Sequence, residues 1–177
     1  MEMTIKGVKV ETVTDDIASQ EDISAVVNAA NAQLKSGGGV AGAIHRAAGP
    51  GLEEECRPLA PIRPGEAVAT GAHNLPNEYV IHCLGPVYGR DKPEEKLLAG
   101  CYRNALRLAE ENAVDSVAFP ALSTGAFGYP FEDAAGVAVR TVFNLIPELE
   151  NVKKIRFVMF DKKDLEKFEN ILNRFQK

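Results

Sequence analysis

Two glycine-rich segments contain the residues whose types and spacing could bind an anion. The first, Lys35–Ile44, reads KSGGGVAGAI, and the second, Ser123–Pro130, reads STGAFGYP. Glycines let the backbone approach a ligand closely, and free N–H groups beside a helix N-terminus attract phosphate. Each segment lies between a strand-like run and a helix-like run. We therefore expect two phosphate-binding loops, which would flank one crevice for a diphosphate if their strands are parallel neighbours.

The pattern around these loops alternates strands with helices. The apolar spacing of strands is found in residues 3–14, 25–27, 66–70, 79–84, 116–122 and 154–160. Helical spacing is found in residues 40–48, 93–109 and 131–146, and in a last helix that Asp161 can cap. Strands first and then alternating units predict a single domain over residues 1–177. Its expected fold is α/β, a three-layer α/β/α sandwich around a central mixed, largely parallel sheet.

The composition limits the partners and the location. The net charge of −5 provides no basic field for nucleic-acid phosphates, so direct nucleic-acid binding is not expected. No apolar run reaches the roughly 20 residues of a bilayer span, and the acidic, alternating N-terminus is unlike a signal peptide. The cysteines are odd in number and lack metal-ligand spacing, which predicts buried thiols. We expect a cytoplasmic protein that needs no membrane, metal or cofactor.

A dinucleotide-binding enzyme is a remote alternative. Gly37, Gly39 and Gly42 satisfy the G-x-G-x-x-G fingerprint, but that fingerprint normally follows its strand at once. An acidic residue should also stand at the end of the next strand, about 20 residues further on. Here several residues intervene after the strand, and the acidic residues 53–55 lie in a helical stretch. The context therefore disfavours an NAD-dependent oxidoreductase.

The order and spacing of three motifs resemble those of the macro domain family. The motifs are Val27-Asn28-Ala29-Ala30-Asn31, Gly37-Gly38-Gly39-Val40, and Ala121-Leu122-Ser123-Thr124-Gly125-Ala126-Phe127-Gly128. The resemblance extends from about Asp16 to Phe160 and agrees with the expected fold. It implies a site for ADP-ribose in which the backbone amides of both loops hold the diphosphate and Asn31 meets the distal ribose.

The resemblance also implies contacts to adenine. In the family an Asp before an Ile near the first strands binds the adenine amino group; Asp16-Ile17 matches it, with Asp15 as the alternative if the register slips by one. An aromatic residue after the penultimate strand commonly stacks on adenine, and Phe160 matches that place. The residues implied in ADP-ribose binding are Asp16, Ile17, Asn28, Ala29, Asn31, Gly37, Gly38, Gly39, Val40, Ala41, Ser123, Thr124, Gly125, Ala126, Phe127 and Phe160.

Several polar and aromatic residues also have an ordinary structural explanation. Asn28 could cap a turn through its own side chain, and Phe160 could be a core residue. His45 in the first helix is interpreted as a satisfied, partly buried histidine. His73 and His82 have no nucleophile or metal-ligand pattern beside them and are interpreted as structural.

One departure from the family affects the expected activity. Members that resemble MacroD-type hydrolases carry Asp directly after the Gly-Gly-Val element, whereas this chain has Ala41. Other macro domains with Ala at this place bind ADP-ribose, and some remove it from acidic side chains. The leading hypothesis is a protein that binds ADP-ribose and hydrolyses ADP-ribosyl esters, either mono-ADP-ribose on acidic protein side chains or O-acetyl-ADP-ribose, with Asn31 as the candidate catalytic residue. The alternative is a reader that binds ADP-ribose or ADP-ribosylated proteins without turnover.

Overall fold

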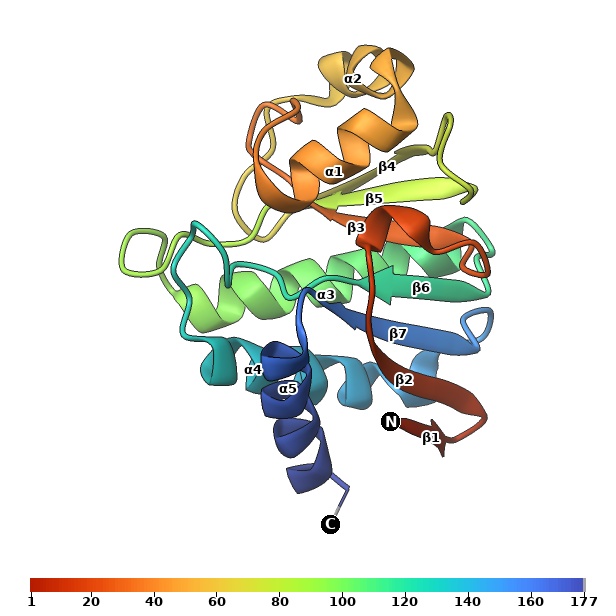
Figure 1. Cartoon of the computed structure of the whole chain (residues 1–177), viewed down its shortest axis with the longest axis vertical. Coiled ribbons are helices and arrows are strands. Elements are labelled where there is room, and N and C mark those ends of the chain that lie inside the picture. Colours follow the sequence, from red (N-terminus) through yellow and green to blue (C-terminus); the bar gives the residue numbers. More distant parts are fainter. Residues whose placement is uncertain (177) are drawn as a thin grey trace.

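The computed structural model describes residues 1–176 and contains one seven-stranded sheet with five α-helices (Figure 1). The strands are β1 (Glu2–Ile5), β2 (Val8–Thr14), β3 (Ala25–Ala29), β4 (Ala67–Gly71), β5 (Tyr79–Cys83), β6 (Ser116–Phe119) and β7 (Lys154–Met159). The α-helices are α1 (Gly39–Ala48), α2 (Pro50–Cys56), α3 (Glu94–Glu111), α4 (Phe131–Leu145) and α5 (Lys162–Arg174). Short 3₁₀ turns are η1 (Ile17–Ser19), η2 (Arg57–Leu59) and η3 (Ile146–Glu148). Among the described residues no helix combines the length and apolar character needed to cross a membrane.

The sheet is mixed, with a parallel centre and antiparallel edges. Its strand order is β1-β2-β7-β6-β3-β5-β4. The five central strands, from β2 to β5, pair in parallel, while β1 and β4 pair antiparallel to their neighbours. In the β3–β5 register Asn28 lies opposite His82, so both side chains point to the same face.

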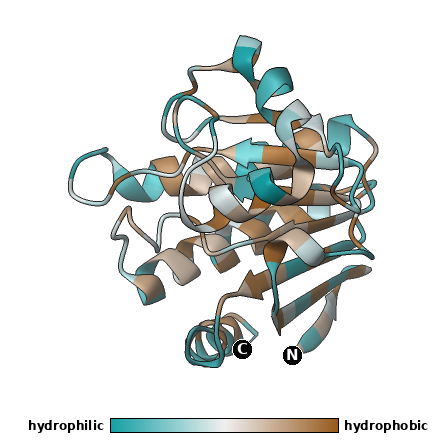
Figure 2. Ribbon diagram, turned by 45° about the horizontal axis from the view of Figure 1, so that its top comes forward, coloured by the Kyte–Doolittle hydropathy of each residue, from teal (hydrophilic) through white to brown (hydrophobic). Residues whose placement is uncertain are grey.

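Two apolar cores lie on opposite faces of the sheet and make a three-layer α/β/α sandwich. The larger core packs α3, α4 and α5 against the sheet, with Phe119, Phe157 and Phe168 among its buried side chains. The smaller core packs α1 and α2 against the other face, with Ile44 and Leu52 buried. Figure 2 shows apolar colour concentrated on the central strands and more hydrophilic colour on the outer helices and loops. The expected fold class is confirmed.

The N-terminal strand pattern is interrupted in the structure. Residues 3–14 were expected to form exposed-face strands, but β1 and β2 are separated by a two-residue hairpin turn. Lys6 and Gly7 adopt φ values of 46° and 83°, the left-handed backbone that a tight hairpin requires. β2 is largely buried because it pairs with β7 as well as with β1.

Three element ends also differ from the pattern. Gly49 (φ 83°) ends α1 as expected, but Pro50 begins a second helix, because proline is well accommodated in the first turn of a helix. β6 ends at Phe119 rather than at residue 122. β7 ends at Met159, before Phe160, and it is the last strand of the described chain rather than the penultimate one. Asp161 caps α5 as expected, accepting from the Asp164 N–H at 2.8 Å.

Candidate functional site

The predicted site residues follow neighbouring parallel strands at one edge of the sheet. β2 leads to Asp16, β7 to Phe160, β6 to Ser123–Phe127, and β3 to Asn31 and the first glycine loop. These strands are direct neighbours in the order β2, β7, β6, β3, so all four carboxyl ends lie at the same edge. Neighbouring strands are about 4.8 Å apart, which spreads the four segments over roughly 14 Å.

The two glycine loops stand where the chain leaves the sheet in opposite directions. β3 and β6 pair in parallel, with Ala25 opposite Val117, so the condition for two flanking loops is met. From β3 the chain enters α1 on one face, and from β6 it enters α4 on the other face (Figure 1). Such a divergence of neighbouring strands is the usual ligand position in open α/β sheets.

The first loop is anchored by Asn31 and Leu34. The Asn31 side chain accepts from the Lys35 N–H at 3.0 Å and donates to the Lys35 carbonyl at 2.7 Å. Leu34 has φ 56°, a left-handed conformation that costs a non-glycine residue about 1 kcal/mol or more. Its side chain is almost fully buried in the smaller core, which offsets that cost. The loop is therefore positioned by the protein itself.

The amides at the start of α1 are free. Within residues 1–176, the backbone N–H groups of Gly37–Ala41 donate to no other protein group, and no side chain caps α1. The first N–H groups of a helix have no intrahelical acceptor and carry the positive end of the helix dipole. This arrangement favours an anionic ligand.

The glycines of the first loop have two different functions. A Cβ on Gly42 would collide with the carbonyl oxygen of Gly37, so glycine is required for this close approach. A Cβ on Gly38 or Gly39 would meet no atom within 4 Å, and only Gly39, with φ 55°, needs glycine for its backbone. The G-x-G-x-x-G spacing is thus explained by packing inside the loop and by open space at the start of α1.

The second loop begins with a strained serine. Ser123 has φ 67°, is buried, and accepts from the Tyr129 N–H at 2.9 Å through its carbonyl oxygen. Its hydroxyl lies so close to Gly85 that a side chain there would collide with it. Left-handed backbone at a non-glycine residue persists only when the surroundings enforce it. The conformation of this loop is therefore set by the segment after β5.

The second loop also presents free amides. The Gly128 N–H donates to the Gly125 carbonyl at 3.0 Å, which closes a turn within the loop. The Tyr88 N–H donates to the Phe127 carbonyl at 2.9 Å, which ties the loop to the segment after β5. The N–H groups of Gly125–Phe127 donate to no other group in the described part of the chain. Both loops thus carry unpaired backbone donors on adjacent strand ends.

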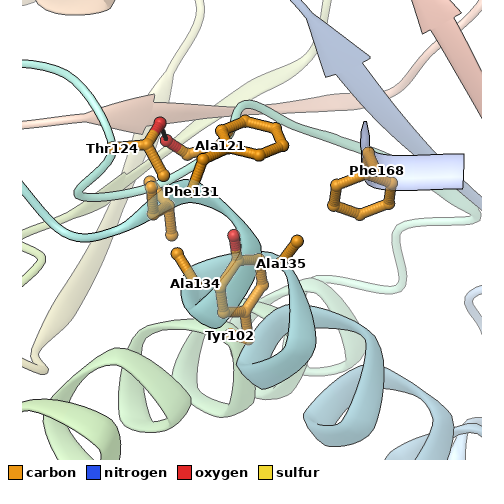
Figure 3. A pocket seen from close by; sticks show the side chains of 8 residues that line it. Tyr102, Ala121, Thr124, Phe131, Ala134, Ala135 and Phe168 are labelled. Atoms are coloured by element: carbon orange, nitrogen blue, oxygen red, sulfur yellow. Dashed lines mark hydrogen bonds between the residues drawn. The ribbon is translucent and has the colours of Figure 1, made fainter. Parts of the chain in front are cut away.

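Apolar side chains support the second loop from beneath. Ala121, Leu122 and Thr124 face Tyr102 of α3 together with residues of α4 and α5 (Figure 3). The α4 and α5 side chains are Phe131, Ala134, Ala135 and Phe168. The gap among them is too narrow for a water molecule, so it is packing rather than a ligand site. Burial raises the pKa of the Tyr102 hydroxyl, which therefore stays neutral.

The predicted adenine contacts lie after β2 and β7, at one end of the row of strand ends. Asp16 caps η1 by accepting from the Ala18 N–H at 2.9 Å, and Ile17 is buried. Asp15 uses its carboxylate inside the turn, accepting from the Asp16 N–H at 2.8 Å. Phe160 is 91% exposed, so its interpretation as a core residue is wrong. An exposed aromatic ring beside a carboxylate can stack on a base and pair with its amino group.

Asn28 belongs to a buried polar cluster. Asn28 donates to His82 Nδ1 at 3.0 Å, and His82 Nε2 lies 2.9 Å from the Thr70 hydroxyl and 3.6 Å from the Cys56 sulfur. The interpretation of Asn28 as a turn cap is wrong, because it lies in β3 and is 1% exposed. Its Oδ1 has no partner within residues 1–176. Asn28 is thus buried in the sheet, whereas Asn31 lies on the first glycine loop.

The buried histidines are held neutral. Burial, with a smaller contribution from nearby His45, lowers the pKa of His82 from 6.5 to about 3. Burial also lowers the pKa of His45, against the opposing charge of Glu53. His45 is buried as expected, but its Nε2 finds no partner among the described residues, so it is not a satisfied histidine. Neither imidazole reaches solvent as a general base.

Stability should fall as the pH drops below 6.5. In this pH range His82 binds a proton in the unfolded chain, whereas in the folded chain it does so only near pH 3. Acid therefore favours unfolding. The slope approaches about 1.4 kcal/mol per pH unit, and His45 adds to it in the same direction. Thermal unfolding of the natural chain and of His82→Gln between pH 7.5 and 5 checks this. The variant should show the shallower loss of Tm, and an equally steep loss would contradict the assignment.

The cysteines are free and buried, as expected. Cys56, Cys83 and Cys101 form no disulfide. Burial raises the pKa of the Cys56 thiol to about 11, which keeps it protonated and unreactive. No group of three His, Cys, Asp or Glu side chains within residues 1–176 is placed to hold a metal ion.

The residues that support the site were not found from the sequence. Gly85 shapes the second loop, and Gln20 and Arg156 hold the turn at Asp16. Two signals could have indicated them. Gly85-Pro86 directly follows a strand, where close approach to a ligand loop is common, and Arg156 is a lone charge inside the apolar run of β7, where a charge requires a buried partner.

The fold and the paired loops define a macro domain. A family model described as Macro domain matches residues 27–138, which include both glycine loops. The chain belongs to the macro domain family.

The similarity extends over nearly the whole chain. A macro domain-containing protein of Chlorobaculum tepidum is 45% identical, covering 94% of this chain and 96% of that protein. A Klebsiella pneumoniae protein named O-acetyl-ADP-ribose deacetylase is 44% identical, covering 94% of this chain and 97% of that protein. The solved structure of the Oceanobacillus iheyensis macrodomain with ADP is 35% identical and superimposes with a TM-score of 0.95, covering 99% and 96% of the two chains. The Trypanosoma brucei macrodomain in complex with ADP-ribose is 34% identical and superimposes with a TM-score of 0.84. This match covers 91% of this chain and 68% of that chain.

Proposed function

We propose that this chain, acting as a single macro domain over residues 1–177, binds ADP-ribose along the strand-end edge. The observation that carries the proposal is the pair of loops with unpaired N–H groups, Gly37–Ala41 and Gly125–Phe127, on adjacent parallel strands. A net charge of −5 leaves backbone amides and a helix dipole as the means of holding an anion. A diphosphate placed between the loops would accept from both.

The other proposed contacts follow the order of the strands. Phe160 and Asp16, after β7 and β2, would take the adenine at one end. Asn31, after β3, would take the distal ribose at the other end. Ile17 and Ala29 would line the path, as would Ser123 and Thr124 on the second loop. Asn28 would contribute only through its unpartnered Oδ1, because its amide nitrogen donates to His82.

The proposed reaction is hydrolysis of an ester on the distal ribose. A water molecule held between Asn31, that ribose and the α-phosphate attacks the ester, the carbon–oxygen bond breaks, and the products are ADP-ribose and a carboxylic acid. The loop amides would stabilise the charge on the phosphates, and the anchored loops would fix the geometry. Candidate substrates are ADP-ribosylated acidic side chains and O-acetyl-ADP-ribose. The name of the Klebsiella pneumoniae relative supports the second.

Ala41 favours a second candidate function, a reader without turnover. Ala41 is buried in the first turn of α1, and its methyl group offers no carboxylate where MacroD-like members carry one. Such a reader would bind ADP-ribosylated proteins through the same edge. A cytoplasmic location is part of either version, and three free buried thiols support a reducing compartment.

Calorimetric titration with ADP-ribose, with AMP and NAD as controls, tests the proposal. ADP-ribose should bind most tightly, because AMP lacks the diphosphate and distal ribose, and NAD carries a nicotinamide on that ribose. The same samples are then incubated with O-acetyl-ADP-ribose and with a glutamate-ADP-ribosylated protein. Binding with release supports a hydrolase, and binding without release supports a reader. Failure to bind ADP-ribose would overturn both.

A further inference from the structure

We propose that Gln20 and Arg156 are positioning residues for base recognition, which hold the Asp15–Ile17 turn so that Asp16 selects adenine. This inference rests on the proposed binding of ADP-ribose. Neither residue reaches the strand-end edge itself. Gln20 is 1% exposed and Arg156 9% exposed, and both lie beneath the turn that follows β2.

Arg156 is the fixed point of the arrangement. Its Nε donates to Glu11 at 2.8 Å, and its two terminal nitrogens donate to Asp22 at 2.7 and 2.6 Å. One of these nitrogens also donates to Gln20 Oε1 at 2.8 Å. A buried guanidinium with this many acceptors has little freedom to move.

The arginine determines which way the Gln20 amide faces. A guanidinium has only donors, so the Gln20 oxygen must face Arg156 and the Gln20 NH₂ must face away from it. That NH₂ donates to the Asp16 carbonyl at 2.7 Å and to the Asp15 carboxylate at 3.1 Å. Gln20 therefore transmits the position of a strand residue to the turn.

The turn is thereby held at both ends of Asp16. Its N–H donates to the Asp15 carboxylate at 2.8 Å, and its carbonyl accepts from Gln20 at 2.7 Å and from the Ser19 N–H at 3.0 Å. One carboxylate oxygen of Asp16 accepts from the Ala18 N–H at 2.9 Å. Among residues 1–176 the other accepts only a long hydrogen bond, at 3.4 Å, from the Ser19 hydroxyl. This second oxygen remains free to accept from an amino group of a base.

The consequence is a selectivity that can be measured as a ratio of affinities. Adenine presents an amino donor to Asp16, whereas hypoxanthine presents a carbonyl oxygen at the same place. A hydrogen bond to a carboxylate corresponds to a preference of roughly 10- to 100-fold. The natural chain should therefore bind ADP-ribose more tightly than inosine diphosphate ribose by that factor. A partial loss of folded protein weakens both affinities equally and leaves the ratio unchanged.

The test compares Gln20→Met, Gln20→Glu and Asp22→Asn by calorimetry with both nucleotides. Methionine keeps the length of Gln20 without its donors. Glutamate keeps the contact with Arg156 but repels Asp15 and the Asp16 carbonyl, so it replaces Gln20→Met if that variant does not fold. Both Gln20 variants should reduce the ratio to within about 3-fold of unity. Asp22→Asn weakens the ion pair that anchors Arg156 and should lower the ratio less than either Gln20 variant, because Glu11 still holds the guanidinium.

The outcomes separate this inference from the proposed function. If the natural chain binds neither nucleotide, the proposed function fails. If it binds ADP-ribose with a clear preference and the Gln20 variants keep that preference, only the positioning role is overturned. Equal binding of the two nucleotides by the natural chain would overturn the role of Asp16, and the inference with it.

Discussion

Gly38→Glu is expected to abolish ADP-ribose binding while the fold stays intact. Gly38 has φ −88° and ψ 178°, which any residue adopts, and a Cβ there meets no atom within 4 Å. The side chain would enter the open space at the start of α1 and bring a negative charge to the diphosphate. Two like charges 4 Å apart repel by about 4 kcal/mol near a protein surface. The affinity should therefore fall by on the order of 100-fold or more.

Two further variants isolate the cause of that loss. Gly38→Gln fills the same space without the charge and should lose less affinity than Gly38→Glu. Gly136→Glu makes the same change on α4, where a Cβ also meets no atom, and should bind ADP-ribose normally. Calorimetry gives the affinities, and thermal unfolding shows whether each variant is folded. Unchanged binding by a folded Gly38→Glu protein would refute the placement of the diphosphate on the first loop.

The loops could be located from the sequence because their physical requirements are local. Glycines before a helix, a strand before the glycines, and a second segment of the same kind are all visible in Lys35–Ile44 and Ser123–Pro130. The inference that they lie side by side needed the strand order, which the pairing of β3 with β6 provides. The order and spacing of the macro domain motifs assigned both loops to one ligand site, which the apolar periodicity alone does not do.

Other features could not be predicted because they depend on contacts between distant segments. The hairpin turn at Lys6-Gly7 separates two strands, but apolar and polar residues alternate on both sides of it. The turn therefore left no obvious break in the sequence pattern of residues 3–14. Ser123 adopts a left-handed backbone under the influence of Gly85, 38 residues earlier in the chain. Phe160 looked like a strand end, and only the end of β7 at Met159 places its ring outside the core.

The Asn28–His82 pair also could not be predicted from the sequence, because it depends on how two strands of the sheet pair. An asparagine in a strand-like run is usually read as a turn residue, because its side chain competes for nearby backbone. Here the β3–β5 register places a histidine opposite it, and the two side chains form a hydrogen bond inside the protein. The register is a property of the whole sheet and cannot be obtained from either strand alone.

Asn31→Ala is expected to reduce turnover more than binding. The Asn31 amide uses one hydrogen and one oxygen lone pair on Lys35, which leaves a second hydrogen and a second lone pair for a ligand and a water molecule. Its loss would remove one anchor of the first loop, and we expect an affinity loss on the order of 10-fold from a pair of hydrogen bonds to the backbone. The attacking water would also lose its partner. Removing one such positioned group commonly lowers kcat on the order of 100-fold.

The two effects are separated by measuring each on its own. Calorimetry with ADP-ribose measures the affinity, which depends on the conformation of the first loop. The rate of O-acetyl-ADP-ribose hydrolysis at saturating substrate measures kcat for the chemical step. Because Leu34 anchors the loop independently through the smaller core, the variant should remain folded and still bind. A much larger loss in kcat than in affinity supports a catalytic Asn31. Equal losses in both would assign Asn31 to the loop alone, and since Ala41 supplies no carboxylate, the water would then have to be held by the substrate and the loop amides.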